Sequence, residues 1–389
     1  MVIKVILLLV FFAVMLGIGF YSRKHATDVN GFVLGGRSVG PWLTAFAYGT
    51  SYFSAVVFVG YAGQFGYKYG LASTWIGIGN AVLGSLLAWV VLGRRTRIMT
   101  KHLKSMTMPD FFGKRYGSKS LRVAASMIAF IFLIPYTASV YNGLSYLFGM
   151  AFDIDFRICV VVMAVLTGVY VIVGGYMATA LNDLIQGIIM LFGIVAVIAA
   201  VLSGHGGFLA AVKELAHVPS DVMPGAYASF FGPDPLNLLG VVILTSLGTW
   251  GLPQMIQKFY AIKDEKAVHT GTIISTLFAV VVSGGCYFLG GFSQISGVTE
   301  AADGSVAYDT IIPTMLSSLP DILIGIVIVL VLSASMSTLS SLVLTSSSTL
   351  TLDFIKPLFV KDMSEKKQLI WMRIPVSYTH LTLPTILRV

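Results

Sequence analysis

The stretch "LSASMSTLSS", Leu332–Ser341, carries a hydroxyl on six of its ten side chains, yet it lies inside an apolar run, Ile322–Leu344. On a helix, at about 100° per residue, five of these hydroxyls share one side: Ser333, Ser337, Ser340 and Ser341, with Thr338 at the edge. A hydroxyl in a membrane helix usually bonds back to its own backbone or lets helices pack closely. A stripe of five also suits Na⁺, which needs several oxygen ligands, and neutral hydroxyls supply them without burying charged side chains. Both interpretations stay open at this point.

The whole chain is as apolar as this run. Of its 389 residues 56% are hydrophobic and 11% are charged, more apolar surface than a soluble domain buries. Nine segments approach or exceed the roughly 17–25 residues that cross a bilayer: Val5–Phe20, Trp42–Ala62, Trp75–Leu92, Val123–Tyr141, Ile158–Val173, Leu184–Leu202, Leu238–Leu252, Ile273–Phe288 and Ile322–Leu344. We expect an all-α, polytopic membrane protein with about nine transmembrane helices, the first of them retained.

The basic residues indicate the orientation. With the N-terminus outside, 20 of the 25 Lys and Arg fall on the inner side, where cytoplasmic loops gather them. The inner loops are then Ser22–Gly40, Arg94–Arg122, the turn before Asp183, Lys258–Thr270 and the segment from Asp353. Glu300, Asp303, Asp309 and Asp321 lie outside. The net charge of +8 therefore reflects membrane topology and predicts no nucleic-acid partner.

Two spans are interrupted near the middle. Gly49, Thr50, Ser51 and Ser54 interrupt the second, and Gly248, Gly251 and Pro253 interrupt the seventh. Glycine and proline are common in membrane helices, so one break alone means little. Two breaks in corresponding positions are typical of a secondary transporter, in which unwound carbonyls bind ions near the midplane.

Asp183, in "TALNDLIQGIIM", has two readings. A carboxylate within a membrane segment is costly and usually functional. An acid at the start of a helix also interacts favourably with the helix dipole. Position alone does not decide between them.

Five stretches together resemble the sodium:solute symporter family: "FVLGGRSVGPW", "TMPDFFGKRYGSKSLR", "YVIVGGYMATALNDLIQGIIMLFG", "GLPQMIQKFYAIKD" and "LSASMSTLSS". The resemblance runs from about Val5 to about Lys356 and implies a LeuT-like fold of inverted repeats. "GGRSVG" also matches the nucleophile elbow of esterases, but Pro41 opens a membrane span there rather than a strand–turn–helix unit. We expect no enzyme.

The resemblance also implies site residues. The principal Na⁺ site would use carbonyls of Thr50, Phe53 and Ala334 with the hydroxyls of Ser337 and Thr338. A candidate second Na⁺ site would use Asp183, Ser340 and Ser341. Na⁺ is the coupling ion, and no other cofactor is expected.

The solute cavity departs from the sodium/proline members of the family. They carry an aspartate where this chain has Tyr52, and bulky aromatics where it has Thr245 and Thr249, which argues against proline as the solute. The candidate cavity residues are Tyr52, Ser54, Thr245, Thr249 and Trp250.

We expect three parts in the chain: the symporter domain at 1–356, with an incomplete second repeat, a basic cytoplasmic loop at 357–375, and a non-native tail at 376–389. The predicted function is Na⁺-coupled symport of a small organic solute across the cytoplasmic membrane, with the solute, Na⁺ and the bilayer as partners and no obligate protein partner. The alternative is a membrane sensor whose symporter-like domain feeds a signalling partner. A passive channel is disfavoured, since rings of identical charges are missing from the sequence.

Overall fold

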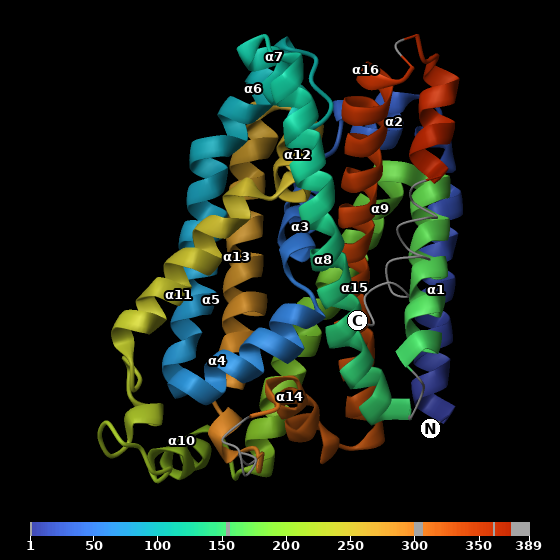
Figure 1. Ribbon diagram of the computed structural model, residues 1–389. Helices are drawn as coiled ribbons and strands as arrows, with labels where there is room; N and C mark the ends of the chain where they lie inside the picture. Colours follow the sequence, from blue (N-terminus) through green and yellow to red (C-terminus); the bar gives the residue numbers. More distant parts are fainter. Residues whose placement is uncertain (1, 153–155, 299–305, 361, 375–389) are drawn as a thin grey trace.

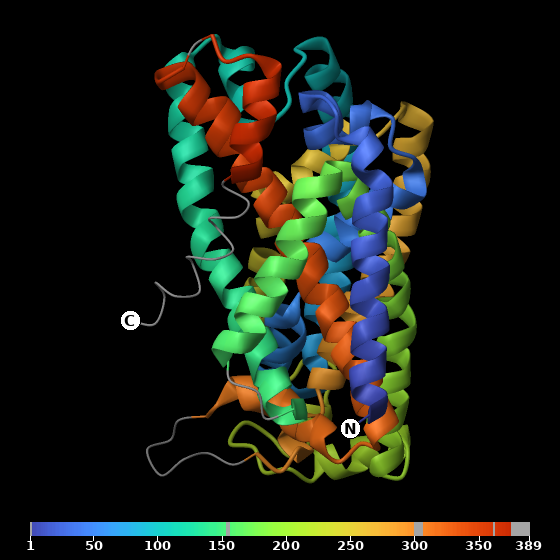
Figure 2. The same ribbon diagram turned by 90° about the vertical axis from the view of Figure 1, so that its right-hand side faces the viewer.

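The computed structural model describes residues 2–152, 156–298, 306–360 and 362–374, and in this part the chain is a bundle of long helices along one axis (Figures 1 and 2). No strand forms in the described residues, although Val39 and Ile262 make an isolated bridge. Glu300, Asp303 and the tail at 376–389 lie outside the described residues.

The elements follow the apolar segments. The long helices are α1 (Val2–Ser22), α8 (Lys119–Phe152), α9 (Phe156–Gly204), α13 (Glu265–Gly290) and α15 (Asp321–Thr349). The shorter ones are α2 (Val29–Leu34), α3 (Pro41–Tyr52), α4 (Ala62–Tyr69), α5 (Thr74–Gly79), α6 (Arg94–His102), α7 (Met108–Tyr116), α10 (Phe208–Ala216), α11 (Pro235–Gly248), α12 (Pro253–Ala261), α14 (Tyr308–Ser317) and α16 (Lys356–Leu358). Stretches of π-helix at 56–61, 80–87, 89–93 and 350–355 continue these helices. A further helix at 365–374 occupies what the sequence predicts as a loop.

By length and composition alone, six helices can cross a membrane, or seven if the bent pair Pro235–Gly251 and Pro253–Ala261 is one span. Two of the candidates, Val56–His102 and Val160–Gly204, are 47 and 45 residues long, about twice what a crossing needs. Gly70 (φ 60°, ψ −143°) and Gly175 (φ 54°, ψ −147°) interrupt them. In Figure 2 the two halves of α9 run antiparallel on either side of its break. Counting each long candidate as two crossings and the bent pair as one gives nine, the number of segments predicted from the sequence.

Both predicted interruptions are present in the structure. Helix α3 ends at Tyr52, and Phe53 takes an extended conformation (φ −88°, ψ 116°). Leu252 does the same (φ −77°, ψ 117°) between α11 and α12, whose axes differ by 52°. Pro253 opens α12, where its missing amide hydrogen costs no helical bond. Each break removes carbonyls from the regular helical ladder.

Helix α15 lies at the centre of the bundle (Figure 1), in contact with α1, α3, α8, α9 and α12. Every side chain from Leu330 to Thr349 is buried. A helix that is surrounded on all sides must pair its polar groups inside the protein, because no water or lipid headgroup reaches them. The hydroxyl stripe is therefore part of the interior.

Close packing of α4 against α13 depends on two glycines. A Cβ on Gly66 would lie 1.8 Å from the carbonyl oxygen of Gly290, and a Cβ on Gly290 would lie 2.1 Å from the carbonyl oxygen of Ala62. Small residues at such crossings let backbones approach, which is how membrane helices gain packing contacts. This contact anchors the second half of the broken span that begins with α3.

Candidate cation and solute site

The five residues expected to form the principal cation site come together in the structure. The Ser337 hydroxyl lies 3.2 Å from the carbonyl oxygen of Thr50 and 3.0 Å from that of Ala334. The Thr338 hydroxyl lies 3.2 Å from the carbonyl oxygen of Thr50, 3.0 Å from that of Phe53 and 3.1 Å from that of Ala334. All five residues are buried. The site therefore joins the middle of α15 to the break after α3.

These five oxygens are poorly satisfied by one another. Each hydroxyl has a single proton to donate, so Ser337 and Thr338 together can serve only two of the five short contacts at a time. The remaining contacts bring lone pairs of oxygen atoms together. A cation at their centre would accept electron density from all five oxygens at once, and the arrangement is suited to that chemistry.

Asp183 does not lie at the start of a helix. It is in α9, eight residues after the break at Gly175, and it is 0% exposed. The reading as a helix-start acid is therefore wrong, because the interaction with the dipole is confined to the first turn. Neither carboxylate oxygen of Asp183 has a hydrogen-bond partner among the described residues, and its ion-pair partner is the Lys258 Nζ, 3.8 Å from Oδ2.

Lys258 is the residue that sequence reasoning assigned wrongly. It was expected in an inner loop, whereas it belongs to α12 and is 2% exposed. Its Nζ donates a hydrogen bond of 3.0 Å to the Ser341 Oγ and lies 5.1 Å from the centre of the Tyr176 ring. The sequence contains a signal for its burial. Lys258 lies in a largely apolar stretch soon after Pro253, before the charged residues of the following loop begin.

The hydroxyl stripe divides into two groups. Ser333 bonds back to the carbonyl of Val329, and Ser340 to that of Ser337, so the packing interpretation holds for both contacts. Ser341 instead reaches across to α3, where its Oγ lies 2.8 Å from the Ser51 Oγ. Of the three residues expected around a second cation, Asp183 and Ser341 both contact Lys258, and Ser340 bonds within its own helix.

A small cavity of about 30 Å³ lies beside the break in α3. Two of the five predicted cavity residues, Tyr52 and Thr249, line it. The other three are not among its lining residues: Ser54 is buried, Thr245 bonds to Asn80, and the Trp250 Nε1 donates to the carbonyl of Leu83 at 2.9 Å. A cavity of this volume holds about one water molecule, so the pocket is closed to a solute in this conformation.

Asn80 organises the polar wall of this cavity, and the sequence analysis missed it. Its Nδ2 donates to the Tyr52 hydroxyl at 3.1 Å and to the Ser283 Oγ at 3.3 Å. Its Oδ1 accepts from Thr245 at 3.3 Å and from Ser246 at 3.1 Å. One amide thus connects four elements around the cavity, through partners that a local sequence pattern does not reveal.

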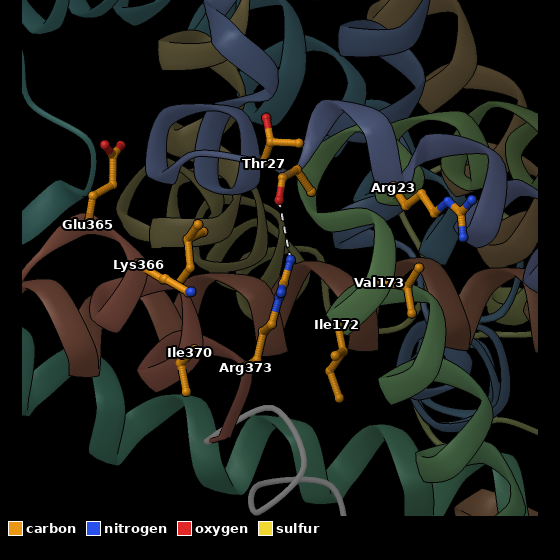
Figure 3. A pocket seen from close by; sticks show the side chains of 10 residues that line it. Arg23, Thr27, Ile172, Val173, Glu365, Lys366, Ile370 and Arg373 are labelled. Atoms are coloured by element: carbon orange, nitrogen blue, oxygen red, sulfur yellow. Dashed lines mark hydrogen bonds between the residues drawn. The ribbon is translucent and has the colours of Figure 1, made fainter.

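A larger hollow of about 890 Å³ lies elsewhere, between the end of α1, the middle of α9 and the helix at 365–374 (Figure 3). Its basic residues are Arg23, Lys366 and Arg373, and the Arg373 Nη2 donates to the carbonyl of Ala26 at 3.2 Å. No residue of either helix break lines it. It is separate from the cation and solute site.

A network of charged residues holds together the end of the bundle that carries α6, α7 and α16. The Arg122 Nε lies 2.8 Å from the Asp353 Oδ1, and Asp353 is fully buried. Arg122 also lies 3.3 Å from Asp110, which pairs with Lys114 at 2.8 Å. Thr107 donates to the second oxygen of Asp353. This network ties α7 and α8 to the end of α15.

Comparisons with known proteins agree with this geometry. The model of the sodium:solute symporter family matches residues 32–383. The sodium/proline symporters of Staphylococcus aureus strains JH9 and NCTC 8325 are each 32% identical to this chain over 364 residues, which cover 90% of this chain and 68% of theirs.

Among solved structures, the substrate-bound, outward-open Na⁺-coupled sialic acid symporter matches 99% of this chain and 82% of its own, with a TM-score of 0.81 and 16% identity. Mhp1, a nucleobase-cation-symport-1 family transporter in a closed conformation with bromovinylhydantoin bound, matches 92% of this chain and 74% of its own, with a TM-score of 0.52 and 13% identity. These likenesses show a LeuT-like fold.

Proposed function

Because the chain belongs to the sodium:solute symporter family, we propose that it carries one small organic solute into the cell together with Na⁺, with its N-terminus outside. The Lys and Arg of the inner loops support this orientation. The family works by secondary transport, and no chemical step on the solute is involved.

The observation that carries the proposal is the cluster of five oxygens between α3 and α15. Two hydroxyl protons cannot satisfy the contacts that Ser337 and Thr338 make with three carbonyls. Na⁺ suits this set because all five oxygen ligands are neutral, so no charged side chain has to be buried to form the site. We assign Thr50, Phe53, Ala334, Ser337 and Thr338 to the principal Na⁺ site.

Coupling between ion and solute follows from one shared residue. The carbonyl of Phe53 faces the cation site, and the same residue lines the small cavity with Tyr52. A cation that fixes the conformation of Phe53 changes the shape of the solute pocket, and by linkage the solute changes the affinity for Na⁺ by the same factor. Because the pocket is closed here, we assign the solute site to the walls of this cavity in a more open state.

We expect the solute to be a small polar molecule. The relatives named sodium/proline symporters make proline the first compound to test, although the family resemblance at Tyr52, Thr245 and Thr249 argues against it. The residues that line the cavity carry no formal charge, which favours a solute with no net charge.

The test is uptake by the protein reconstituted in liposomes, from a panel of radiolabelled amino acids, sugars and carboxylates. The expected result is accumulation of one solute class with an inward Na⁺ gradient and little uptake when K⁺ replaces Na⁺ outside. Equal uptake in both ions would contradict Na⁺ coupling. Uptake down the solute gradient alone, with no accumulation, would indicate a passive channel.

A further inference from the structure

We propose that the ammonium group of Lys258 is a built-in cation that takes the place of a second Na⁺ between Asp183 and Ser341, so that the protein binds one Na⁺ in each transport cycle. This inference rests on the proposed function, because it assumes Na⁺ at the principal site. It makes Lys258 a residue that sets the coupling stoichiometry.

The contacts of Lys258 are those expected of a bound cation. A buried cation at this place would be held by a carboxylate and by hydroxyl oxygen. The Lys258 Nζ has one of each, the Asp183 Oδ2 at 3.8 Å and the Ser341 Oγ at 3.0 Å. It also faces the ring of Tyr176, whose electron-rich surface attracts cations. The side chain comes from α12, directly after the second helix break.

Charge balance leaves no room for a further ion at this position. Asp183 is 0% exposed and Lys258 is 2% exposed, and the salt bridge between them leaves a neutral pair. A Na⁺ bound between the same two groups would lie within a few ångströms of the Lys258 ammonium, and two like charges at that separation repel strongly in the protein interior.

The hydroxyl of Ser341 is also already occupied. It lies 2.8 Å from the Ser51 Oγ and accepts the hydrogen bond from Lys258. A hydroxyl has one proton and two lone pairs, so these two partners use most of its capacity. Little is left for a metal ion.

The fixed cation and the mobile one share helix α15, and Ser341, which accepts from Lys258, also contacts Ser51 on α3. Ser341 is one helical turn from Ser337 on α15, and Ser51 follows Thr50 on α3. Lys258 therefore supports the junction of α3 and α15 from one turn away, where it is always present, whereas Na⁺ reaches the principal site only when it binds from solution.

The test counts bound Na⁺ directly and needs no knowledge of the solute. The full protein is purified in detergent, and radioactive Na⁺ bound per protein is measured by equilibrium dialysis over a range of Na⁺ concentrations. We expect one Na⁺ per protein in the wild type and two in Lys258→Ala, since Asp183 then lacks its cation and the truncated side chain leaves space for an ion. The control, Lys263→Ala, removes a lysine that is exposed on the nearby loop and should leave the count at one.

A double variant, Lys258→Ala with Asp183→Asn, keeps the test valid if the single variant fails to fold. It has neither charge, and we expect it to bind one Na⁺ with an affinity within about threefold of the wild type, a change of less than about 0.7 kcal/mol. Two Na⁺ in the wild type falling to one in the double variant would overturn the proposal, as would one Na⁺ in folded Lys258→Ala. Absence of Na⁺ binding in the wild type would instead refute the proposed function and this inference with it.

Discussion

The hydroxyl of Thr338 lies 3.0 Å from the carbonyl oxygen of Phe53, the residue at which α3 leaves its helical path. This contact joins the middle of the central helix to a carbonyl that the broken ladder of α3 leaves free. Because Phe53 also lines the small cavity, we expect a change at the proposed cation site to alter the proposed solute pocket through this residue.

Removing the two hydroxyls at the junction should weaken Na⁺ binding. Ser337→Ala with Thr338→Ala should raise the Na⁺ concentration for half-maximal uptake by at least about tenfold, which corresponds to ~1.4 kcal/mol. The matched control is Ser347→Ala with Ser348→Ala, since both hydroxyls bond to the carbonyl of Leu344 within α15. Unchanged Na⁺ dependence in a well-expressed double variant would refute the assignment of the principal site.

Asp183→Asn should destabilise the protein because it leaves the Lys258 ammonium buried without a counter-ion. Breaking one side of a buried ion pair costs about 3–5 kcal/mol, and the separation of 3.8 Å places the expected loss near 3 kcal/mol. Adding Lys258→Met should restore more than half of this loss, since the remaining pair is neutral. Thermal unfolding in detergent measures both variants. A loss below about 1 kcal/mol for Asp183→Asn would show that the two groups are not coupled.

The ion pair between Arg122 and the buried Asp353 should contribute far more to stability than the exposed pair between Arg94 and Glu265. Arg122→Met leaves the fully buried Asp353 without its partner and should cost about 3 kcal/mol. Arg94→Met removes a pair with Glu265 in which both side chains are largely exposed, and should cost less than ~1 kcal/mol. Thermal unfolding compares the two variants, and equal losses would contradict a structural role for Arg122.

Gly66→Ala should prevent the close approach of α4 and α13. The added methyl would lie 1.8 Å from the carbonyl oxygen of Gly290, so the backbones must separate. We expect loss of folded protein, measured as the monodisperse fraction in size-exclusion chromatography. Gly240→Ala is the control, because the space around Gly240 in α11 is open and alanine favours helix by up to ~1 kcal/mol. A normal yield of folded Gly66→Ala would contradict the packing described here.

The orientation predicts opposite labelling at the two ends of the bundle. In a background with Cys159→Ser and Cys286→Ser, a cysteine at the exposed Lys101 should react with an impermeant maleimide only after the cells are opened. A cysteine at the exposed Val222 should react in intact cells. The reverse pattern would place the N-terminus inside.

Local chemistry is enough to predict much of this protein. Apolar length determines which segments become long helices, since each must bury its backbone polar groups within itself. Glycine and proline act on their own helix, so the breaks at Phe53 and Leu252 follow from nearby residues. The position of Ser337 and Thr338 on one side of α15 follows from helical periodicity alone.

The identity of each polar group's partner depends on the tertiary structure. Ser333 and Ser341 look alike in the sequence, yet Ser333 bonds within α15 and Ser341 contacts Ser51, a residue 290 positions away. Lys258 counts as a loop lysine by composition. Only the packing of α12 against α15, from which the side chain reaches α9, makes it the buried partner of Asp183. A hydroxyl or an ammonium bonds to whichever group the fold places within about 3 Å. The order of residues along the chain does not determine which group that is.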